Sequence, residues 1–395
     1  MSKKLLALMA TLAIAACAEP TSTPQLAEQD PPPVSVGAAE PIEGQYIVVF
    51  KSSTLEPRRL SGALVTRVNG TMLHTYTHVV RGFAARLSDE GVDAIRKDVN
   101  VAYVEQDQVM RIVTTQSNAT WGLDRIDQRS RPIDGTFTYN NTGAGVNAYI
   151  IDTGILLTHS EFTGRVFTGF DAVTTGGTAN DCNGHGTHVA GTTGGTTYGV
   201  AKGVKLYAVR VLSCSGSGTT SGVIAGVDWV TANHVKPAVA NMSLGGGAST
   251  TLDNAVANSI AAGVSYAIAA GNGNRGGRQQ DACNFSPARV AAAMTIGATT
   301  NTDAKASWSN YGPCVDWFAP GVGITSAWYT SNTATNTISG TSMATPHVAG
   351  VAALYLQSNP GSTPQQVRDA LYANTTKGIV TSSSTANNHL LFTNY

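Results

Sequence analysis

The stretch Gly340-Thr341-Ser342-Met343-Ala344-Thr345-Pro346-His347 places a serine where a buried helix begins. The apolar residues that follow, from Val348 to Leu356, predict that helix, with Ser342 in its first turn. Unpaired backbone N–H groups and the positive end of the helix dipole favour negative charge there. A serine hydroxyl becomes a strong nucleophile only when a base takes its proton and a third group orients that base. The rest of the chain must supply both groups.

The chain before this helix alternates apolar strands with helical patterns. One helix contains Val223, Val227 and Val230, and another runs through Val256 and ends at Gly263. Near the C-terminus, Thr363, Pro364 and Gln366 form a capping box that predicts a helix start. The predicted strands are Val146–Ile151, Val204–Val211, Ala238–Met242, Val264–Ala270 and Met294–Ala298. Strands that are apolar throughout predict a parallel sheet between two helix layers, an α/β domain from about residue 116 to 395.

A smaller unit precedes this domain. A helical pattern at Asp89–Lys97 lies among short strand-like segments, which are Tyr46–Lys51, Met72–His78, Gly82–Leu87 and Val101–Val104. Roughly 70 residues of this kind form a small α+β domain that is only marginally stable alone. The proline-rich residues 19–44 predict a disordered tether.

The first 18 residues predict export. Lys3 and Lys4 precede an apolar run from Leu5 to Ala16, which is typical of a secretory signal and too short for a membrane span. Two interpretations of its end remain open. In the first, Cys17 is the acylated cysteine of a bacterial lipoprotein, because it follows small residues as such a cysteine does. In the second, an ordinary signal peptide is cleaved after the small residues Ala16 and Ala18.

Composition excludes nucleic acid as a partner. The 395 residues have zero formal net charge, only 13% are charged, and no basic stripe is present for phosphate binding. Apart from Cys17, the chain has four cysteines: Cys182, Cys214, Cys283 and Cys314. An even count in an exported chain predicts two disulfides, with three possible pairings.

Three polar residues at predicted strand or helix ends are candidate partners of Ser342. Asp152 closes an apolar strand, His185 lies between two glycines before a small-residue helix, and Asn272 follows the strand at Ser265–Ala270. Ligands in open parallel sheets gather beyond the carboxyl ends of the strands. We therefore expect an orienting acid, a base and an amide donor for an oxyanion. Zinc binding by His185 and His188 is disfavoured, because further ligands and a glutamate base are missing.

The local sequences resemble those of a known enzyme family. Asp152-Thr-Gly, His185-Gly-Thr-His-Val-Ala-Gly and Gly-Thr-Ser342-Met-Ala-Thr-Pro-His are similar to the active-site signatures of the subtilisin-like serine peptidases. The resemblance covers Trp121–Tyr395 and is strongest to the proteinase K branch, including aqualysin-like and Vibrio-type secreted enzymes. It implies a secreted serine endopeptidase with Ser342 as nucleophile, His185 as base, Asp152 as orienter and Asn272 in the oxyanion hole.

The resemblance also implies a self-processing zymogen. Residues 1–18 would be the signal and 19–44 the tether, and 45–112 would be a ferredoxin-like inhibitory propeptide that also aids folding. Residues 113–395 would form the peptidase domain, matured by cleavage near Thr115-Gln116. The implied disulfides are Cys182–Cys214 and Cys283–Cys314. If Cys17 is acylated, the lipid would tether the precursor, and cleavage would release a soluble, monomeric enzyme.

Two edge segments, Ser215–Gly218 and Ser243–Gly246, are expected to pair as added strands with an extended polypeptide substrate. Such pairing implies broad specificity, and the small first-pocket walls imply a preference for a large apolar or aromatic side chain before the cut bond. The residues that the resemblance assigns to these edges and to the first pocket are Gly216, Ser217, Gly218, Ser243, Leu244, Gly245, Ala269, Ala270 and Gly271.

Structural calcium is implied at two places. One set is Asp316 with the carbonyl groups of Ala291 and Ala293, and the other is Asp124, Asp127, Gln128 and Asp134. For the second set an alternative stays open, in which its aspartates are solvated surface residues near a helix start and bind no metal.

Two other functions compete with that of a secreted endopeptidase of broad specificity. A tethered binding protein on a retired peptidase fold would explain Cys17, but no catalytic residue is missing. A maturation protease with one partner is the narrower enzymatic alternative.

Overall fold

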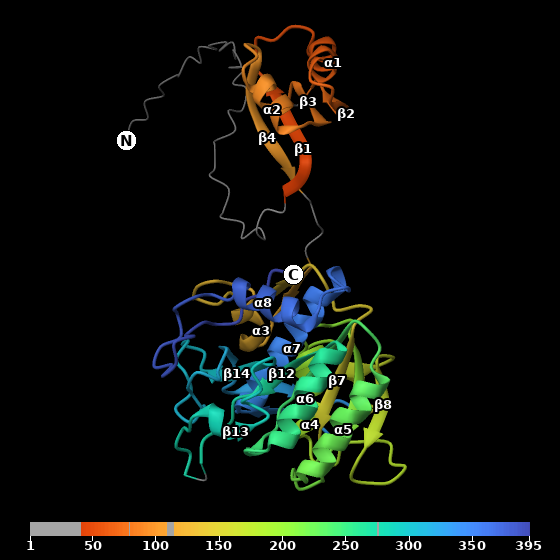
Figure 1. Ribbon diagram of the computed structural model, residues 1–395, viewed down its shortest axis with the longest axis vertical. Coiled ribbons are helices and arrows are strands. Elements are labelled where there is room, and N and C mark those ends of the chain that lie inside the picture. The colour runs from red at the N-terminus through yellow and green to blue at the C-terminus, as the bar shows by residue number, and fades with distance from the viewer. Residues whose placement is uncertain (1–40, 79, 109–113, 275) are drawn as a thin grey trace, which may run out of the picture. The chain divides into compact units, whose positions relative to one another are not determined.

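The structure, a computed structural model, describes residues 41–78, 80–108, 114–274 and 276–395 (Figure 1). The predicted signal, Cys17 and most of the predicted tether lie outside the described residues. No helix within the described ranges is long and apolar enough to cross a membrane. The first strand begins at Pro41, inside the segment predicted as tether, because Pro41 pairs with Gln108.

The N-terminal module has the order β-α-β-β-α-β of a ferredoxin-like fold, as predicted. Its antiparallel sheet has the strand order β2-β3-β1-β4. The elements are β1 (Pro41–Phe50), α1 (Pro57–Arg67), β2 (Thr71–Tyr76), β3 (Gly82–Arg86), α2 (Asp89–Arg96) and β4 (Val101–Gln108). A small core that includes Val48, Leu64, Phe83 and Ile95 joins the helices to the sheet.

Helix α1 is the element of this module that the sequence analysis missed. Pro57 occupies its start, and Ser61, Leu64 and Val65 are buried at helical spacing. The signal was therefore present, but Arg58 and Arg59 in the first turn and Gly62 in the middle of the helix weakened it.

The second module is built on a seven-stranded sheet in which every pairing is parallel, which confirms the predicted parallel sheet and adds two strands to the five predicted. The order is β15-β14-β12-β10-β7-β9-β8. Its strands are β7 (Asn147–Asp152), β8 (Val166–Asp171), β9 (Lys205–Arg210), β10 (Ala238–Met242), β12 (Val264–Ala269), β14 (Met294–Thr299) and β15 (Trp317–Pro320). The two edge strands, β8 and β15, were not predicted, since β8 is half exposed and β15 is only four residues long.

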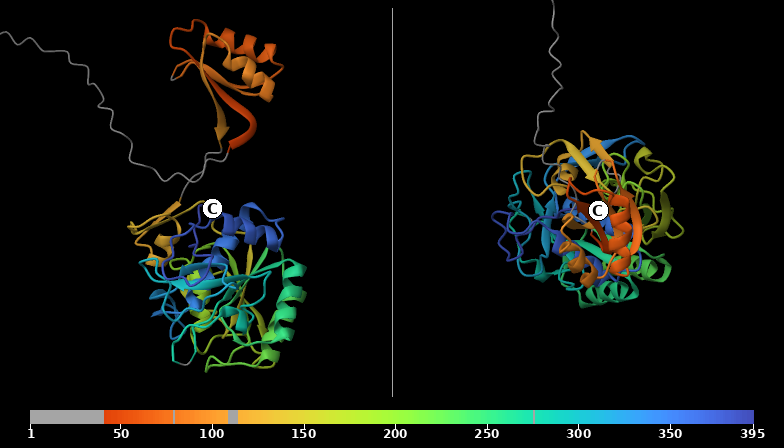
Figure 2. Two further views of the ribbon diagram at one scale, coloured as in Figure 1. Left: turned by 60° about the vertical axis from the view of Figure 1, so that its left-hand side comes forward. Right: turned by 90° about the horizontal axis from the view of Figure 1, so that it is seen from above.

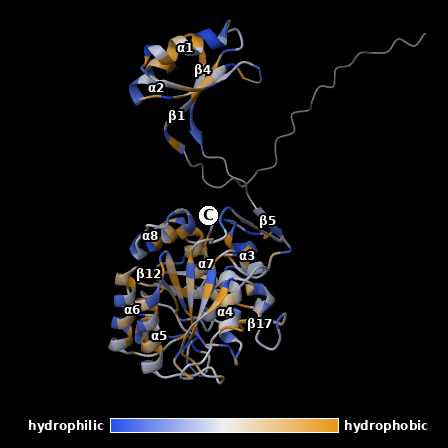
Figure 3. Cartoon of the chain, turned by 90° about the vertical axis from the view of Figure 1, so that its right-hand side faces the viewer, coloured by the Kyte–Doolittle hydropathy of each residue, from blue (hydrophilic) through white to orange (hydrophobic). Residues whose placement is uncertain are grey.

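Helices cover both faces of this sheet (Figures 1 and 2). One core packs α3 (Trp121–Ile126), α4 (His185–Gly194), α7 (Thr341–Ser358) and α8 (Pro364–Asn374) against one face. The other core packs α5 (Thr220–Asn233) and α6 (Thr250–Ala262) against the opposite face. Apolar residues colour the strands between these layers in Figure 3. The predicted capping box of α8 and the αL end of α6 at Gly263 are both present.

Short elements complete the module. Three antiparallel pairs lie outside the main sheet: β5 (Thr114–Ser117) with β6 (Thr136–Tyr139), β11 (Gly246–Gly247) with β13 (Phe285–Ser286), and β16 (Ile324–Ala327) with β17 (Thr335–Ile338). Two 3-10 turns are η1 (Ser160–Phe162) and η2 (Ala282–Asn284).

Candidate active site

The sheet brings the predicted site residues to one edge. Asp152 is the last residue of β7, and Asn272 follows β12 by three residues. His185 is the first residue of α4, and Ser342 is the second residue of α7. Carboxyl ends of parallel strands and amino ends of the following helices meet at the same edge, so these four residues converge although 190 positions separate Asp152 from Ser342.

Asp152 and His185 form a direct pair. The Nδ1 atom of His185 lies 2.8 Å from Oδ1 of Asp152, whose side chain is fully buried, while a quarter of the His185 side chain is exposed. Oδ1 also accepts a hydrogen bond from the Thr153 backbone N–H at 2.7 Å. The carboxylate therefore fixes the imidazole with its other nitrogen, Nε2, free for chemistry.

The charge on this pair favours the protonated imidazole. Burial lowers the pKa of His185, but the negative charge and hydrogen bond of Asp152, with a further contribution from Asp181, outweigh burial and raise it above 6.5. A base of this kind accepts a proton more readily than a free histidine does.

Close backbone contact makes two motif glycines necessary. A Cβ on Gly154, which has φ +104°, would lie 2.4 Å from the carbonyl oxygen of Ala179. A Cβ on Gly186 would lie 2.1 Å from the carbonyl oxygen of Gly154. Only glycine allows the end of β7 and the first turn of α4 to approach this closely.

Ser342 is held by Ser243. Its Oγ donates to the Ser243 carbonyl at 3.0 Å, and the Ser243 hydroxyl donates to the Ser342 carbonyl at 2.8 Å. Among the contacts of the described residues, Ser342 makes no hydrogen bond to His185. Catalytic hydrogen bonds are often long or absent without substrate, and a χ1 rotation of the serine would release its hydroxyl from Ser243.

Asn272 is oriented by Thr341. Its Oδ1 accepts hydrogen bonds from the backbone N–H and the hydroxyl of Thr341, each at 2.8 Å, which leaves the amide Nδ2 as a free donor. A Cβ placed on Gly340 would lie 3.5 Å from this Nδ2 and 3.5 Å from the backbone N of Ser342. Two nitrogen donors therefore lie close to one point beside Gly340, and donors placed in this way can stabilise an oxyanion.

A cavity of about 420 Å³ adjoins His185. Six of the predicted substrate residues line it: Gly216, Ser217, Gly218, Ser243, Leu244 and Gly245. The other three are not among its lining residues: Ala269 is the last residue of β12, Ala270 and Gly271 follow it, and the Gly271 N–H donates to the Thr341 hydroxyl. Residues of both predicted edges thus line this cavity, and the assignment of Ala269–Gly271 to the first pocket stays a prediction.

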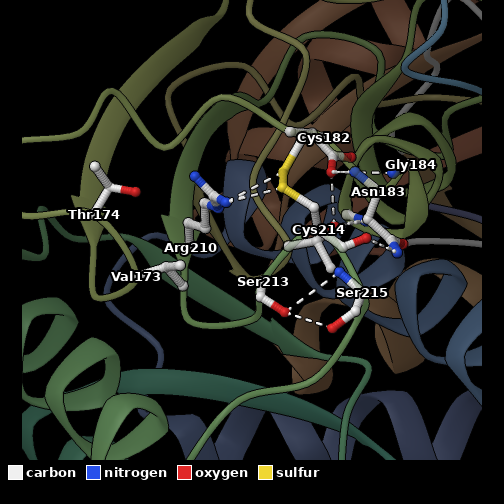
Figure 4. Close-up of a disulfide and its surroundings, with 12 residues drawn as sticks. Val173, Thr174, Cys182, Asn183, Gly184, Arg210, Ser213, Cys214 and Ser215 are labelled. Atoms are coloured by element: carbon white, nitrogen blue, oxygen red, sulfur yellow. Dashed lines mark hydrogen bonds between the residues drawn. A yellow bond between two sulfur atoms is a disulfide. The ribbon is translucent and has the colours of Figure 1, made fainter.

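Both disulfides form the pairs that the resemblance implied, Cys182–Cys214 and Cys283–Cys314. Figure 4 shows the first, which joins the loop before His185 to the loop before Gly216. Nη2 of Arg210 contacts both sulfur atoms, at 3.2 and 3.6 Å, and Nδ2 of Asn183 donates to the Cys214 carbonyl at 3.0 Å. The bond thus links the loop that presents His185 to a wall of the cavity.

The other two histidines near the site are packed inside the protein. Nε2 of His188 contacts the Ile324 carbonyl at 3.0 Å, and Nδ1 of His347 contacts the Met343 carbonyl at 2.9 Å. Burial lowers the pKa of each to about 4, so both are neutral at ordinary pH. Nδ1 of His188 has no hydrogen-bond partner within the described residues.

Asp181 is a residue that the sequence analysis missed. Its buried carboxylate accepts hydrogen bonds from the Thr153 hydroxyl, from the backbone N–H groups of Asn183 and Gly184, and from both the N–H and the hydroxyl of Thr187. It therefore ties the end of β7 to the start of α4. Its position four residues before His185 was the available signal, because acidic residues are favoured near helix N-termini.

The N-terminal set predicted to bind calcium has suitable chemistry. Oδ2 of Asp127 accepts from the Thr138 N–H at 2.6 Å, but its buried Oδ1 has no partner among the described residues. Burial raises the pKa of Asp127 to about 7, and the charges of Asp124 and Asp134 add to this rise. The Gln128 carbonyl accepts a hydrogen bond from Arg125 at 2.6 Å.

Neither predicted calcium set is arranged as a finished site. Within the described ranges, no three His, Cys, Asp or Glu side chains converge as metal ligands do. The first set still fits a hard cation, since an unpartnered carboxylate oxygen lies near two further carboxylates. The second set does not fit, because the Arg368 guanidinium already binds Asp316 and the Ala293 carbonyl.

Comparison with known proteins agrees with this geometry. The family model described as "Subtilase family" matches residues 143–392, and the model "Peptidase inhibitor I9" matches residues 45–113. The chain belongs to the subtilase family. As a subtilase with an N-terminal inhibitor module, it is a serine proteinase.

The relatives that resemble it are named as serine proteases. This subtilase is 55% identical to an extracellular serine proteinase of Thermus sp. (strain Rt41A), over 97% of each chain. It is 52% identical to alkaline serine exoprotease A of Vibrio alginolyticus, over 89% of this chain and 67% of that protein. A solved structure of a cold-adapted subtilisin-like serine proteinase is 57% identical, covers 70% of this chain and 98% of its own, and has a TM-score of 0.66.

Proposed function

We propose that this subtilase is a secreted endopeptidase that cuts peptide bonds by acyl transfer to Ser342 and then to water. The Ser342 Oγ leaves the Ser243 carbonyl and attacks the substrate carbonyl, while Nε2 of His185 takes its proton. His185 then gives this proton to the leaving amine, and water repeats the sequence to release the acyl group. Asp152 keeps Nδ1 protonated and stabilises the imidazolium.

The paired donors at Gly340 are the observation on which this proposal rests most. In the tetrahedral intermediate the former carbonyl oxygen becomes negative, and it would accept hydrogen bonds from Asn272 Nδ2 and the Ser342 N–H. The N-terminus of α7 adds its positive dipole end. Together with the Asp152–His185 pair, these groups supply every role that acyl transfer needs.

A fluorophosphonate that labels serine nucleophiles tests this assignment directly. We expect one adduct, on Ser342, with parallel loss of casein hydrolysis, and neither in Ser342→Ala. Ser358→Ala, at the far end of α7, is the matched control and should keep both. Casein hydrolysis by Ser342→Ala, or a labelled serine elsewhere, would overturn the assignment. Absence of any adduct on the folded protein would favour the competing binding function.

Broad specificity follows from the cavity. The walls at Gly216–Gly218 and Ser243–Gly245 offer backbone groups to an extended peptide, and such pairing distinguishes few sequences. We expect a preference for a large apolar or aromatic side chain before the cut bond, measured with a peptide library. Cleavage of many unrelated denatured proteins would separate this enzyme from a maturation protease with one partner.

We also infer a self-processing precursor. The inhibitor module ends near residue 113, and β5, which contains Thr115 and Gln116, begins at Thr114. Cleavage at Thr115-Gln116 would free the module while β5 keeps its pairing with β6 through Ser117. Mass spectrometry without reduction would report the mature N-terminus, both disulfides and any lipid on Cys17. A mature N-terminus at Cys17 or Ala18 would exclude release by this cleavage.

A structural calcium ion at Asp124, Asp127, Gln128 and Asp134 belongs to the same proposal. The unpartnered oxygen of Asp127 supports it. We expect a monomer, because the proposed mechanism uses residues of one chain.

A further inference from the structure

An arginine lies where the second calcium ion was predicted. Arg368 is in α8, and its Nη2 forms an ion pair with Oδ1 of Asp316. Its Nε donates to the Ala293 carbonyl at 3.2 Å. One guanidinium therefore binds both the carboxylate and one of the two carbonyl groups of the predicted calcium set. The side chains are 27% and 13% exposed, so the pair is largely shielded from water.

The remaining oxygen of Asp316 is also used. Oδ2 accepts a hydrogen bond from the Thr295 N–H at 2.7 Å. Ala291, the last member of the predicted set, lies on an exposed stretch. Calcium needs six to eight oxygen ligands at about 2.3–2.6 Å, and a guanidinium on the same oxygens excludes it by charge and by volume. The residues present therefore match a guanidinium site better than a calcium site.

We propose that Arg368 supplies, as a built-in cation, the positive charge that calcium was predicted to supply here, and that removing its side chain opens this site to calcium. The inference concerns stability and holds whether or not the catalytic proposal is correct.

A cation is needed at this position. The Asp316 side chain is only 13% exposed, and the Arg368 guanidinium is the cation paired with it. Breaking a shielded pair by removing one partner leaves an uncompensated charge and destabilises the protein.

The built-in cation differs from calcium in where it is attached. It belongs to α8 and connects that helix to residues 52 and 75 positions earlier in the chain. Calcium in its place would hold the loop around Ala293 and Asp316 but would not reach α8. The native protein should therefore keep α8 anchored at any calcium concentration.

Calcium binding to purified protein tests the proposal. Protein treated with a sulfonyl fluoride to stop autolysis is stripped of metal with a chelator and titrated with calcium in a calorimeter. We expect Arg368→Ala to bind one more calcium ion than the native protein. The double variant Arg368→Ala/Asp316→Asn should lose that extra ion. Equal stoichiometry in native protein and Arg368→Ala, or loss of a bound calcium in Asp316→Asn alone, would overturn the proposal.

Arg289→Ala is the matched control. Arg289 pairs with Asp253 at 2.6 Å, with side-chain exposures of 30% and 16%, which are close to those of the Arg368 pair. This variant should lose stability in a similar way without gaining a calcium ion. If it gained one as well, calcium uptake would reflect any unpaired carboxylate and the proposal would be wrong.

Thermal unfolding gives a second measurement. In chelator, both variants should melt below the native protein. At a calcium concentration about 100 times the dissociation constant, Arg368→Ala should recover by roughly 5–10 °C more than the native protein and Arg289→Ala do. Recovery that is equal in all three proteins would contradict a site specific to Asp316.

Discussion

At the residue scale, a second buried carboxylate, that of Asp181, binds the residues next to Asp152 and His185. Asp181 touches neither reacting atoms nor substrate, so we regard it as a positioning residue. It accepts hydrogen bonds from Thr153 beside Asp152 and from Gly184 beside His185. Its negative charge also contributes to the raised pKa of His185.

Asp181→Asn should reduce turnover and change its pH dependence. An amide keeps the size but turns an NH₂ toward backbone donors, and misplacement of His185 should lower kcat by about 10- to 100-fold. The base works only when neutral, so a raised pKa moves the acid limb of kcat/KM to higher pH. Loss of the Asp181 charge should therefore move this limb to lower pH.

The control for this variant is Asp171→Asn. Asp171 is another buried carboxylate, but it pairs with Arg210 at 3.3 Å and makes no contact with His185. It should affect stability and leave the acid limb in place. If the acid limb of kcat/KM stays at the same pH in Asp181→Asn, Asp181 has only a structural role.

Asn272 gives a second prediction at this scale. Asn272→Ala should lower kcat by about 10²–10³-fold, roughly 2.7–4 kcal/mol of transition-state stabilisation, with little change in KM. Asn272→Asp separates the donor from the acceptor. It keeps an oxygen for Thr341 but replaces the Nδ2 donor, so steady-state kinetics should show an equal or larger loss. Near-native turnover in Asn272→Asp would mean that only the Thr341 contacts matter.

At the element scale, the two disulfides can be compared with each other. Their sequence separations are 32 and 31 residues, so chain entropy predicts a similar stabilisation of about 3–4 kcal/mol for each. Only Cys182–Cys214 joins the loop before His185 to the cavity wall.

Cys182→Ser/Cys214→Ser should therefore lower both the melting temperature and kcat/KM, whereas Cys283→Ser/Cys314→Ser should lower the melting temperature alone. Calorimetry and peptide hydrolysis measured well below the melting temperature would test this. A similar effect of both double variants on kcat/KM would show that the first disulfide has no special relation to the site.

The elements also differ in how well the sequence predicts them. The central strands were predicted because β7, β10, β12 and β14 are buried along their whole length. Edge strand β8 contains only exposed and half-buried residues and pairs on one side only, so its apolar signal is weak. Helix α8 was predicted from its cap alone, because Thr363 and Gln366 form the signal locally.

At the scale of the whole molecule, the N-terminal module has a far smaller core than the peptidase module. Phe83 is fully buried in that core, with its ring centroid 5.8 Å from that of Phe50. A domain of this size buries little surface and tolerates few cavities.

Phe83→Ala should therefore unfold the module, at a cost of about 3–5 kcal/mol, and reduce the yield of active enzyme. The enzyme that does mature lacks Phe83, so its kcat should equal that of the native enzyme. Val99→Ala, at a residue that is 78% exposed, is the control and should give a normal yield. Normal yield from Phe83→Ala would argue against a role for the module in folding.

The sequence by itself determined the parts of this protein whose signal is local. The order of the modules, the parallel sheet, the helix with Ser342 in its first turn and the choice of Asp152, His185 and Asn272 as candidate residues all follow from short motifs and apolar runs. Strand burial and helix capping depend on neighbours in the chain, and for this reason they can be predicted without coordinates.

Only the tertiary structure decided which distant groups meet. Ser342 is hydrogen-bonded to Ser243, the Gly271 N–H donates to the Thr341 hydroxyl, and Arg368 occupies the place expected for calcium. Each contact joins side chains or backbone groups that are far apart in the sequence. Whether a carboxylate such as Asp316 binds a metal or a guanidinium depends on which charge the folded chain brings to it, and no local pattern contains that information.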